Sequence, residues 1–263
     1  MTLIFHRLFM LLRSTSADPV TPRCRAYQQP AQFTNNNVSQ RLPQLLTVML
    51  LGLVAGPLLF GGTTYAQVIP DLRAKARSEF GPAAEQTVKN WERLIIHGRN
   101  QSLEEQLQLA NRFFNERVRW VSDEEIWGTE DYWATPLETM GKARGDCEDF
   151  SIAKYATLLL MGVDPESLRL IYVKAKRGGL TQAHMVLAWY ASPTTPPLIL
   201  DNIDFSILPA NERGDLVPVF SFNAQALWVG NKTAPSSANP VNRLSRWRSV
   251  LSNMRNEGFD LGV

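Results

Sequence analysis

The chain contains one long apolar helix pattern that begins at a cysteine, and nearly every element predicted after it is a strand. Residues 147–161 carry the pattern, Gly145-Asp146 precede it, and Gly162 is a typical helix stop. The strands are predicted at 168–173, 183–190, 198–201, 217–222 and 226–229. Helices followed by a run of strands with short connections predict an α+β fold with an antiparallel sheet.

The segments before the cysteine are also predicted to be mainly helical. Apolar residues recur at helical spacing over residues 84–97, and Gly98 fits the end of that helix. Ser102-Leu103-Glu104-Glu105 has the form of a capping box that opens a second helix. The remaining expectations are a short strand at 118–121, an irregular segment at 122–144 and a short C-terminal helix at 244–254.

Residues 1–66 have the build of an export leader. An apolar core at residues 45–60 follows Arg41, and small and polar residues then lead to Ala66. The core is 16 residues long and includes Gly and Pro, whereas a membrane-spanning helix needs about 20 apolar residues. We therefore expect a signal that is cleaved near Ala66, with an uncleaved membrane anchor as the alternative. Residues 1–40 show no periodicity and are expected to be disordered.

Residues 67–263 are expected to form a single domain, because their number is ordinary for one domain. Residues 1–66 hold five arginines and one acid, which leaves 22 basic and 24 acidic residues in the rest of the chain. The net charge of +2 therefore comes from the leader. No block of Lys and Arg elsewhere suggests a surface that follows phosphates, so nucleic-acid binding is not expected.

The cysteine at the start of the apolar helix is a candidate nucleophile. Cys24 lies in the leader, so Cys147 is the lone thiol of the exported part and has no internal disulfide partner. A lone thiol in an oxidising compartment is expected to be either buried or used in chemistry. A buried structural cysteine is the alternative, but acidic neighbours are unusual in a core. The positive end of the helix dipole favours the thiolate at Cys147.

One histidine and one aspartate follow in strand-like segments, in the order nucleophile, base, orienting acid. His184 opens an apolar strand, whereas His97 ends a helix and suits a capping role. Asp201 closes the run Leu198 to Leu200, and a carboxylate buried there needs a hydrogen-bond donor such as an imidazole. The alternatives are a histidine merely packed at the end of a sheet and an Asp-Asn turn at Asp201. Asp204 is the nearby competitor for the acid's role.

The acids beside Cys147 oppose its ionisation. Asp146 and Glu148 place negative charge next to a thiolate, and a bound cation would remove the conflict. Hard oxygen ligands select calcium over zinc, so a calcium site is a hypothesis at this point. The alternative is that these acids only complement the dipole of the helix.

Five blocks of the chain resemble the bacterial transglutaminase-like cysteine proteinases. The blocks are Trp127-Gly128, Asp131 to Glu138, Gly145 to Tyr155, Ala183 to Leu187 and Leu200 to Asn202. They are long, they stand in the expected order, and they lie within residues 85–230. The resemblance implies a papain- or transglutaminase-like core, in which the cysteine helix packs on an antiparallel sheet that carries His and Asp. It implies that Cys147 is the nucleophile, His184 the general base and Asp201 its orienter.

The resemblance also implies a bound metal, a cellular location and protein partners. Family members need calcium, and here Asp146 and Glu148 occupy the matching acidic positions, with Asp149 as a further candidate ligand. The family's enzymes act in the periplasm, where they cut large surface adhesins near the N-terminus at a paired-alanine site and so control attachment in biofilms. The periplasmic domain of an inner-membrane cyclic-di-GMP receptor sequesters them.

Two other classes of function remain open from the sequence. A transglutaminase or a peptidoglycan amidase would use the same three residues, since the choice of water or amine as acceptor lies in the pocket. A binding module that kept the fold without activity is the second class. An intact Cys147, His184 and Asp201 argue against the second class.

Overall fold

The computed structural model describes residues 68–230, 234–236, 244–258 and 261. The predicted leader, with its export signal, the cleavage position near Ala66, the expected disorder over 1–40 and Cys24, lies outside the described residues. Among the described residues, no helix combines the length and the apolar character that crossing a membrane requires.

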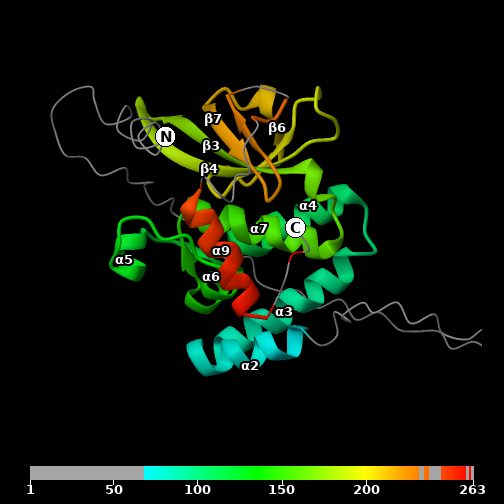
Figure 1. The fold of residues 1–263 in the computed structure, drawn as a ribbon, viewed down its shortest axis with the longest axis vertical. Helices are drawn as coiled ribbons and strands as arrows, with labels where there is room; N and C mark the ends of the chain where they lie inside the picture. The colour runs from blue at the N-terminus through cyan, green and yellow to red at the C-terminus, as the bar shows by residue number, and fades with distance from the viewer. Residues whose placement is uncertain (1–67, 231–233, 237–243, 259–260, 262–263) are drawn as a thin grey trace, which may run out of the picture.

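Six of the described strands form an antiparallel sheet, which lies at the top of Figure 1. Its order is β6-β5-β4-β3-β7-β8, so the hairpin β3–β4 is central. The bounds are β3 Leu168–Arg177, β4 Leu180–Trp189, β5 Leu198–Leu200, β6 Leu208–Pro209, β7 Leu216–Phe222 and β8 Leu227–Val229. A separate parallel pair joins β1 (Arg119–Trp120) to β2 (Arg144–Gly145). The short 3-10 helices Pro165–Ser167 and Ala210–Glu212 lie in the connections.

The helices gather below one face of the sheet (Figure 1). The helix α7 (Cys147–Met161) lies beneath the central strands and packs on β3 and β4, and α4 (Leu103–Arg117) and α3 (Pro82–Gly98) pack on it. Farther from the sheet lies α2 (Val68–Phe80). The short helices α5 (Asp123–Trp127) and α6 (Pro136–Lys142) precede α7, and α9 (Ser245–Asn256) crosses in front of it in this view.

The predicted α+β class with an antiparallel sheet and the predicted helix from Cys147 are confirmed. Gly162 ends α7 in the left-handed region with φ of 95°, which a residue with a Cβ rarely adopts. At the second helix, the hydroxyl of Ser102 accepts the backbone N–H of Glu105 at 3.3 Å, which is half of the predicted capping box.

The structure differs from the sequence prediction in three places. Residues 122–144 are not irregular, because they contain α5 and α6, which the sequence hides because each is very short. The central hairpin is longer than predicted, since residues 174–177 continue to pair with residues 180–183, as far as Arg177 and Leu180 around the two glycines Gly178 and Gly179. The helix α2 was not predicted.

A continuous core lies between α7, the sheet and the surrounding helices. Almost every residue of α7 is buried, so this helix is enclosed on all sides rather than amphipathic. Trp91 of α3 donates from its Nε1 to the hydroxyl of Thr157 at 2.8 Å, and Trp247 of α9 meets the ring of Tyr155 edge-on with centroids 5.7 Å apart. The middle of α7 is therefore held in place by α3 and α9.

Candidate active site

The start of α7 is fixed by hydrogen bonds to a buried carboxylate. Asp149 accepts the backbone N–H of Ala134 at 2.8 Å with Oδ1 and that of Asp146 at 3.3 Å with Oδ2. A Cβ at position 145 would lie 2.8 Å from two atoms of Asp149, so only glycine leaves room for this arrangement. Cys147 follows as the first residue of the helix and is 8% exposed. The predicted site residue Asp149 therefore holds the backbone around the thiol.

The first turns of α7 lie directly against the strand that carries the candidate base. Ser151, one turn after Cys147, donates from its hydroxyl to the carbonyl of Met185 at 3.1 Å. Met185 is the residue after His184 on β4. The same hydroxyl is 2.8 Å from the carbonyl of Cys147. This side chain thus joins the residue next to His184 to the first turn of the cysteine helix.

His184 and Asp201 form a buried pair, as the sequence predicted. The Nε2 of His184 lies 2.8 Å from Oδ1 of Asp201, and each residue is 1% exposed. Asp201 follows the last residue of β5, which is the neighbour of β4 in the sheet. Because the carboxylate accepts a hydrogen bond from Nε2–H, it stabilises the tautomer whose Nδ1 carries the lone pair. His97 is exposed at the end of α3 and takes no part.

Both carboxylate oxygens of Asp201 accept hydrogen bonds. Its Oδ1 also accepts the backbone N–H of Ile203 at 3.0 Å, and its Oδ2 accepts from Arg213 Nη2 at 2.8 Å. Burial raises the pKa of Asp201, but the hydrogen bonds from His184 and Arg213 outweigh it and hold the pKa below its usual value. The competitor Asp204 instead accepts the backbone N–H of Ser206 at 3.0 Å. The geometry therefore supports the choice of Asp201 as the partner of His184.

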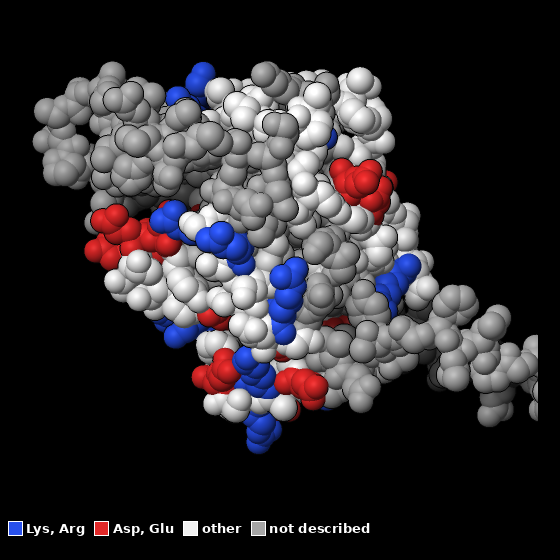
Figure 2. Space-filling view, viewed as in Figure 1, with Lys and Arg blue, Asp and Glu red and all other residues white. Residues whose placement is uncertain are grey.

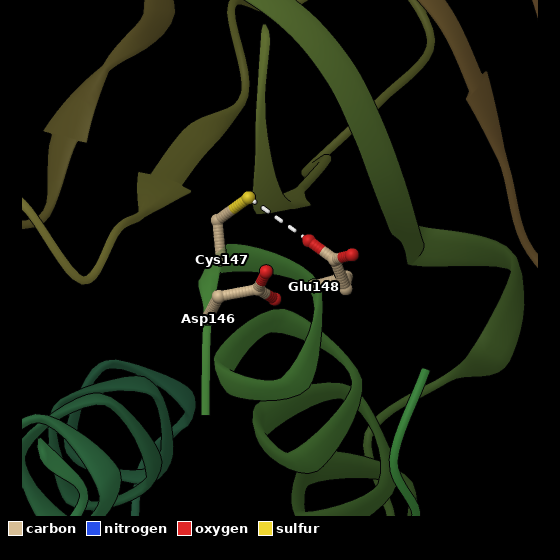
Figure 3. Close-up of side chains that lie close together, drawn as sticks. All are labelled: Asp146, Cys147 and Glu148. Carbon is tan, nitrogen blue, oxygen red and sulfur yellow. Dashed lines mark hydrogen bonds between the residues drawn. The ribbon is translucent and has the colours of Figure 1, made fainter. Parts of the chain in front are cut away.

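The acids predicted beside the thiol converge on it. The Sγ of Cys147 donates to Oε2 of Glu148 at 3.0 Å, and Asp146 points its carboxylate to the same side of the helix start (Figure 3). Ligand atoms of these three residues lie within 4.8 Å of one another. A thiol that donates to a carboxylate is in its protonated form, which is the weaker nucleophile.

The structure adds two acids that the sequence analysis missed. Ligand atoms of Asp123, Asp146 and Asp149 lie within 4.8 Å of one another, and so do those of Asp123, Asp131 and Glu148. The parallel pair β1–β2 is responsible, because it places the segment just before Asp123 next to Gly145. No pattern of residue spacing in the sequence predicts that these two short strands pair. The one available signal was an acid-rich segment, Asp123 to Glu125, directly after a short predicted strand.

The five acids form a cluster that is short of positive charge. Asp123 and Asp149 are buried, whereas Asp131, Asp146 and Glu148 are half-buried. Burial, followed by the charge of Glu148, raises the pKa of Asp123 to about 7 and that of Asp131 to about 6. The same two causes raise the pKa of Asp146 well above its usual value. The Oδ1 atoms of Asp123 and Asp146 are buried and have no hydrogen-bond donor. Carboxylates this close are stable together when they share protons or bind a cation, and an all-oxygen set suits calcium.

The C-terminal helix α9 holds the loop that supplies Asp131. Arg246 pairs with the carboxylate of Asp131 at 2.9 Å and donates to its carbonyl at 3.1 Å. At the other end of α9, Glu257 accepts the hydroxyl proton of Thr135 at 2.7 Å. Acidic side chains also gather on the surface in the region of α5 (Figure 2), where Glu124 and Glu125 are exposed. Such a surface attracts cations toward the buried acids.

The aromatic residues before α7 pack in pairs rather than standing free. The rings of Trp127 and Tyr132 have centroids 4.5 Å apart, and Trp133 stacks on Phe222 at 5.9 Å. Trp133 donates from Nε1 to Oδ1 of Asp131 at 3.0 Å, which commits that N–H to the acidic cluster. Its N–H is thus a poor candidate for binding a reaction intermediate.

Comparisons with known proteins agree with this geometry. The family model for bacterial transglutaminase-like cysteine proteinases matches residues 83–229. Two solved structures of LapG from Legionella pneumophila, one calcium-bound and one EGTA-treated, are each 35% identical to the chain. Each match covers 71% of this chain. It covers 98% of the calcium-bound protein, with a TM-score of 0.62, and 97% of the EGTA-treated protein, with a TM-score of 0.63. A search of curated proteins gives no significant match. From the family model and the similarity to LapG, we conclude that this chain belongs to the bacterial transglutaminase-like cysteine proteinases and shares the LapG fold.

Proposed function

We propose that the chain is a calcium-dependent cysteine endopeptidase in which Cys147 is the nucleophile, His184 the general base and Asp201 the residue that orients it. The observation that carries the proposal is the buried 2.8 Å bond between His184 and Asp201, with His184 on the strand β4, which is bonded to the first turns of the Cys147 helix. Membership of a cysteine proteinase family supports peptide-bond hydrolysis over the transglutaminase and amidase alternatives.

The reaction begins with transfer of the thiol proton to Nδ1 of His184. The thiolate attacks the scissile carbonyl carbon, and the negative charge moves to the carbonyl oxygen. The backbone N–H of Cys147 is a donor for that oxygen, since the first N–H groups of a helix have no partner within the helix. His184 then returns the proton to the leaving amine, which departs and leaves a thioester. Water adds to the thioester with His184 as base, and the acid product and free thiol are released.

Asp201→Asn is expected to lower kcat by roughly 10²- to 10⁴-fold, because an amide donor at this position selects the wrong tautomer of His184. The measurement is the rate of cleavage of a protein substrate at saturating concentration. Asp204→Asn is the matched control, since Asp204 only accepts a backbone N–H in the same loop. Full activity in Asp201→Asn together with loss in Asp204→Asn would reverse the assignment.

The acidic cluster is the proposed calcium site. Asp146 and Glu148, with Asp123 and Asp131, would hold the ion, and Asp149 lies within the same set of atoms. The calcium-bound structure of the similar LapG supports this choice of metal. When bound, calcium would neutralise the acids beside Cys147 and compete for the Glu148 oxygen that accepts the thiol proton.

The proposed substrate is a large cell-surface adhesin, cut near its N-terminus at a paired-alanine site so that the cell is released from a biofilm. The proposed inhibitor is the periplasmic domain of an inner-membrane cyclic-di-GMP receptor. Both rest on the resemblance to the family. The test is incubation of residues 67–263 with an adhesin N-terminal fragment, with and without that receptor domain. A fragment that stays whole under conditions where the enzyme cleaves another protein would exclude the adhesin.

The proposed location is the periplasm, after cleavage of the leader near Ala66. The support is the apolar core at 45–60 with its small-residue end. The N-terminus of protein purified from cells is therefore expected at or near Gln67, as read by mass spectrometry. A chain that begins at Met1 and sediments with membranes would favour the anchored alternative.

A further inference from the structure

Lys154 is a buried lysine in the middle of the cysteine helix, and the reaction above gives it no role. It is 1% exposed, and burial lowers its pKa to about 7. The ion pairs of this region, among the described residues, join Asp201 to His184 and Arg213 and do not include Lys154. The charge of Asp201 raises the pKa of Lys154, but burial outweighs it. Burying an ammonium group outside an ion pair costs stability, and an apolar residue of the same length would pack there more favourably.

The hydrogen bond of Lys154 reaches the acid of the site. Its Nζ donates to the backbone carbonyl of Asp201 at 3.1 Å. Residues 147, 151 and 154 follow one another at helical spacing, so they line one face of α7. Along that face, Cys147 supplies the thiol, Ser151 binds the carbonyl of Met185 beside His184, and Lys154 binds Asp201. One helix face therefore contacts the segments that carry the base and its orienter.

The carbonyl and the carboxylate of Asp201 have separate partners. The carbonyl accepts from Lys154 of α7 and from Nδ2 of Asn115 of α4, the latter at 2.8 Å. The carboxylate accepts from His184, Ile203 and Arg213. Asp201 lies just after the short strand β5, where sheet hydrogen bonds no longer fix the backbone. The two helices thus set the position of the backbone from which the carboxylate reaches His184.

We propose that Lys154 is a positioning residue that, together with Asn115, ties the Asp201 backbone to the cysteine helix and so aligns the orienting acid, the base and the thiol. The inference rests on the proposed protease function. It explains why a lysine occupies a core position: an apolar side chain there would leave the backbone carbonyl of Asp201 held by Asn115 of α4 alone.

The test is Lys154→Met, assayed with a recombinant adhesin N-terminal fragment at saturating calcium. Methionine keeps the length and the packing, so the melting temperature is expected to stay equal or to rise. The kcat is expected to fall by about 10- to 100-fold, because small misplacements of catalytic groups are costly. The KM is expected to change less than about threefold, since Lys154 touches no substrate. Alkylation of Cys147 by iodoacetamide at fixed pH should slow in parallel, and this readout needs no substrate.

Thr157→Val is the matched control on the same helix. Thr157 is equally buried and is bonded to Trp91 rather than to the Asp201 segment. Its variant is expected to lose stability while kcat stays unchanged, which is the opposite signature. If Lys154→Met does not fold, Asn115→Ala removes the other donor to the same carbonyl and is expected to lower kcat by about tenfold.

Three results would overturn the inference. The first is wild-type kcat in Lys154→Met, or in Asn115→Ala where the former does not fold. The second is weaker binding of the substrate, seen as a raised KM, with kcat unchanged. The third is a further loss on adding Lys154→Met to Asp201→Ala, because a residue that acts through Asp201 has no additional effect once that carboxylate is gone. Absence of cleavage by the wild-type protein would instead count against the proposed function, so the two failures are distinguishable.

Discussion

Replacing Cys147 with alanine is expected to abolish cleavage, with kcat/KM falling by roughly 10⁴-fold or more. The covalent route needs a thiolate, and the single free cysteine among the described residues is Cys147. The substitution removes one sulfur atom at a position that is 8% exposed, so the fold should persist. The measurement is cleavage of an adhesin fragment by residues 67–263, followed by electrophoresis and mass spectrometry.

Two controls make the loss interpretable. Calcium-dependent stabilisation of Cys147→Ala should match that of the wild type, because carboxylates rather than the thiol supply the proposed ligands. Ser151→Ala is the matched control variant, since it removes the hydrogen bond to Met185 but leaves the nucleophile, and it should retain measurable activity. Cleavage by Cys147→Ala at the wild-type rate would remove the thiol from the mechanism and, with it, the proposed function.

Removing calcium is expected to have an effect of similar size. With excess chelator, cleavage should fall to background and the melting temperature should drop, because the cluster of five acids would be left with unbalanced charge. Asp146→Asn should weaken calcium binding by about 100-fold, as measured by calorimetry, while asparagine preserves the helix cap. Its melting temperature without calcium should exceed that of the wild type, since one repelling carboxylate is gone.

The control for this experiment is Glu124→Gln, an exposed acid next to Asp123 on α5 that belongs to none of the clustered sets. It should bind calcium within about twofold of the wild type, as surface charges contribute little. Wild-type cleavage that continues unchanged in chelator would exclude calcium dependence. Loss of binding in Glu124→Gln equal to that in Asp146→Asn would show that surface charge, not the buried cluster, attracts the ion.

Much of the site was predictable because its signals are local. The apolar run after Gly145-Asp146 predicts the helix and puts Cys147 at its start, and an aspartate that closes a buried strand predicts a bonded carboxylate. The pair of His184 and Asp201 then follows from two neighbouring strands of an antiparallel sheet. The short helices α5 and α6 were not predictable, because a helix of five or seven residues has too few turns to show a periodic pattern.

The amino-acid sequence by itself determined most of the longer helices and strands, including the cysteine helix and the histidine strand, and the acids on either side of the thiol. Tertiary structure alone decided the rest of the site. The parallel pair β1–β2 brought Asp123 to Asp146, and the loop after β5 met Lys154, Asn115 and Arg213. The physical reason is that helix and strand periodicity is written in neighbouring residues, whereas these contacts join segments far apart in the chain. Their partners become identifiable only when packing brings the segments together.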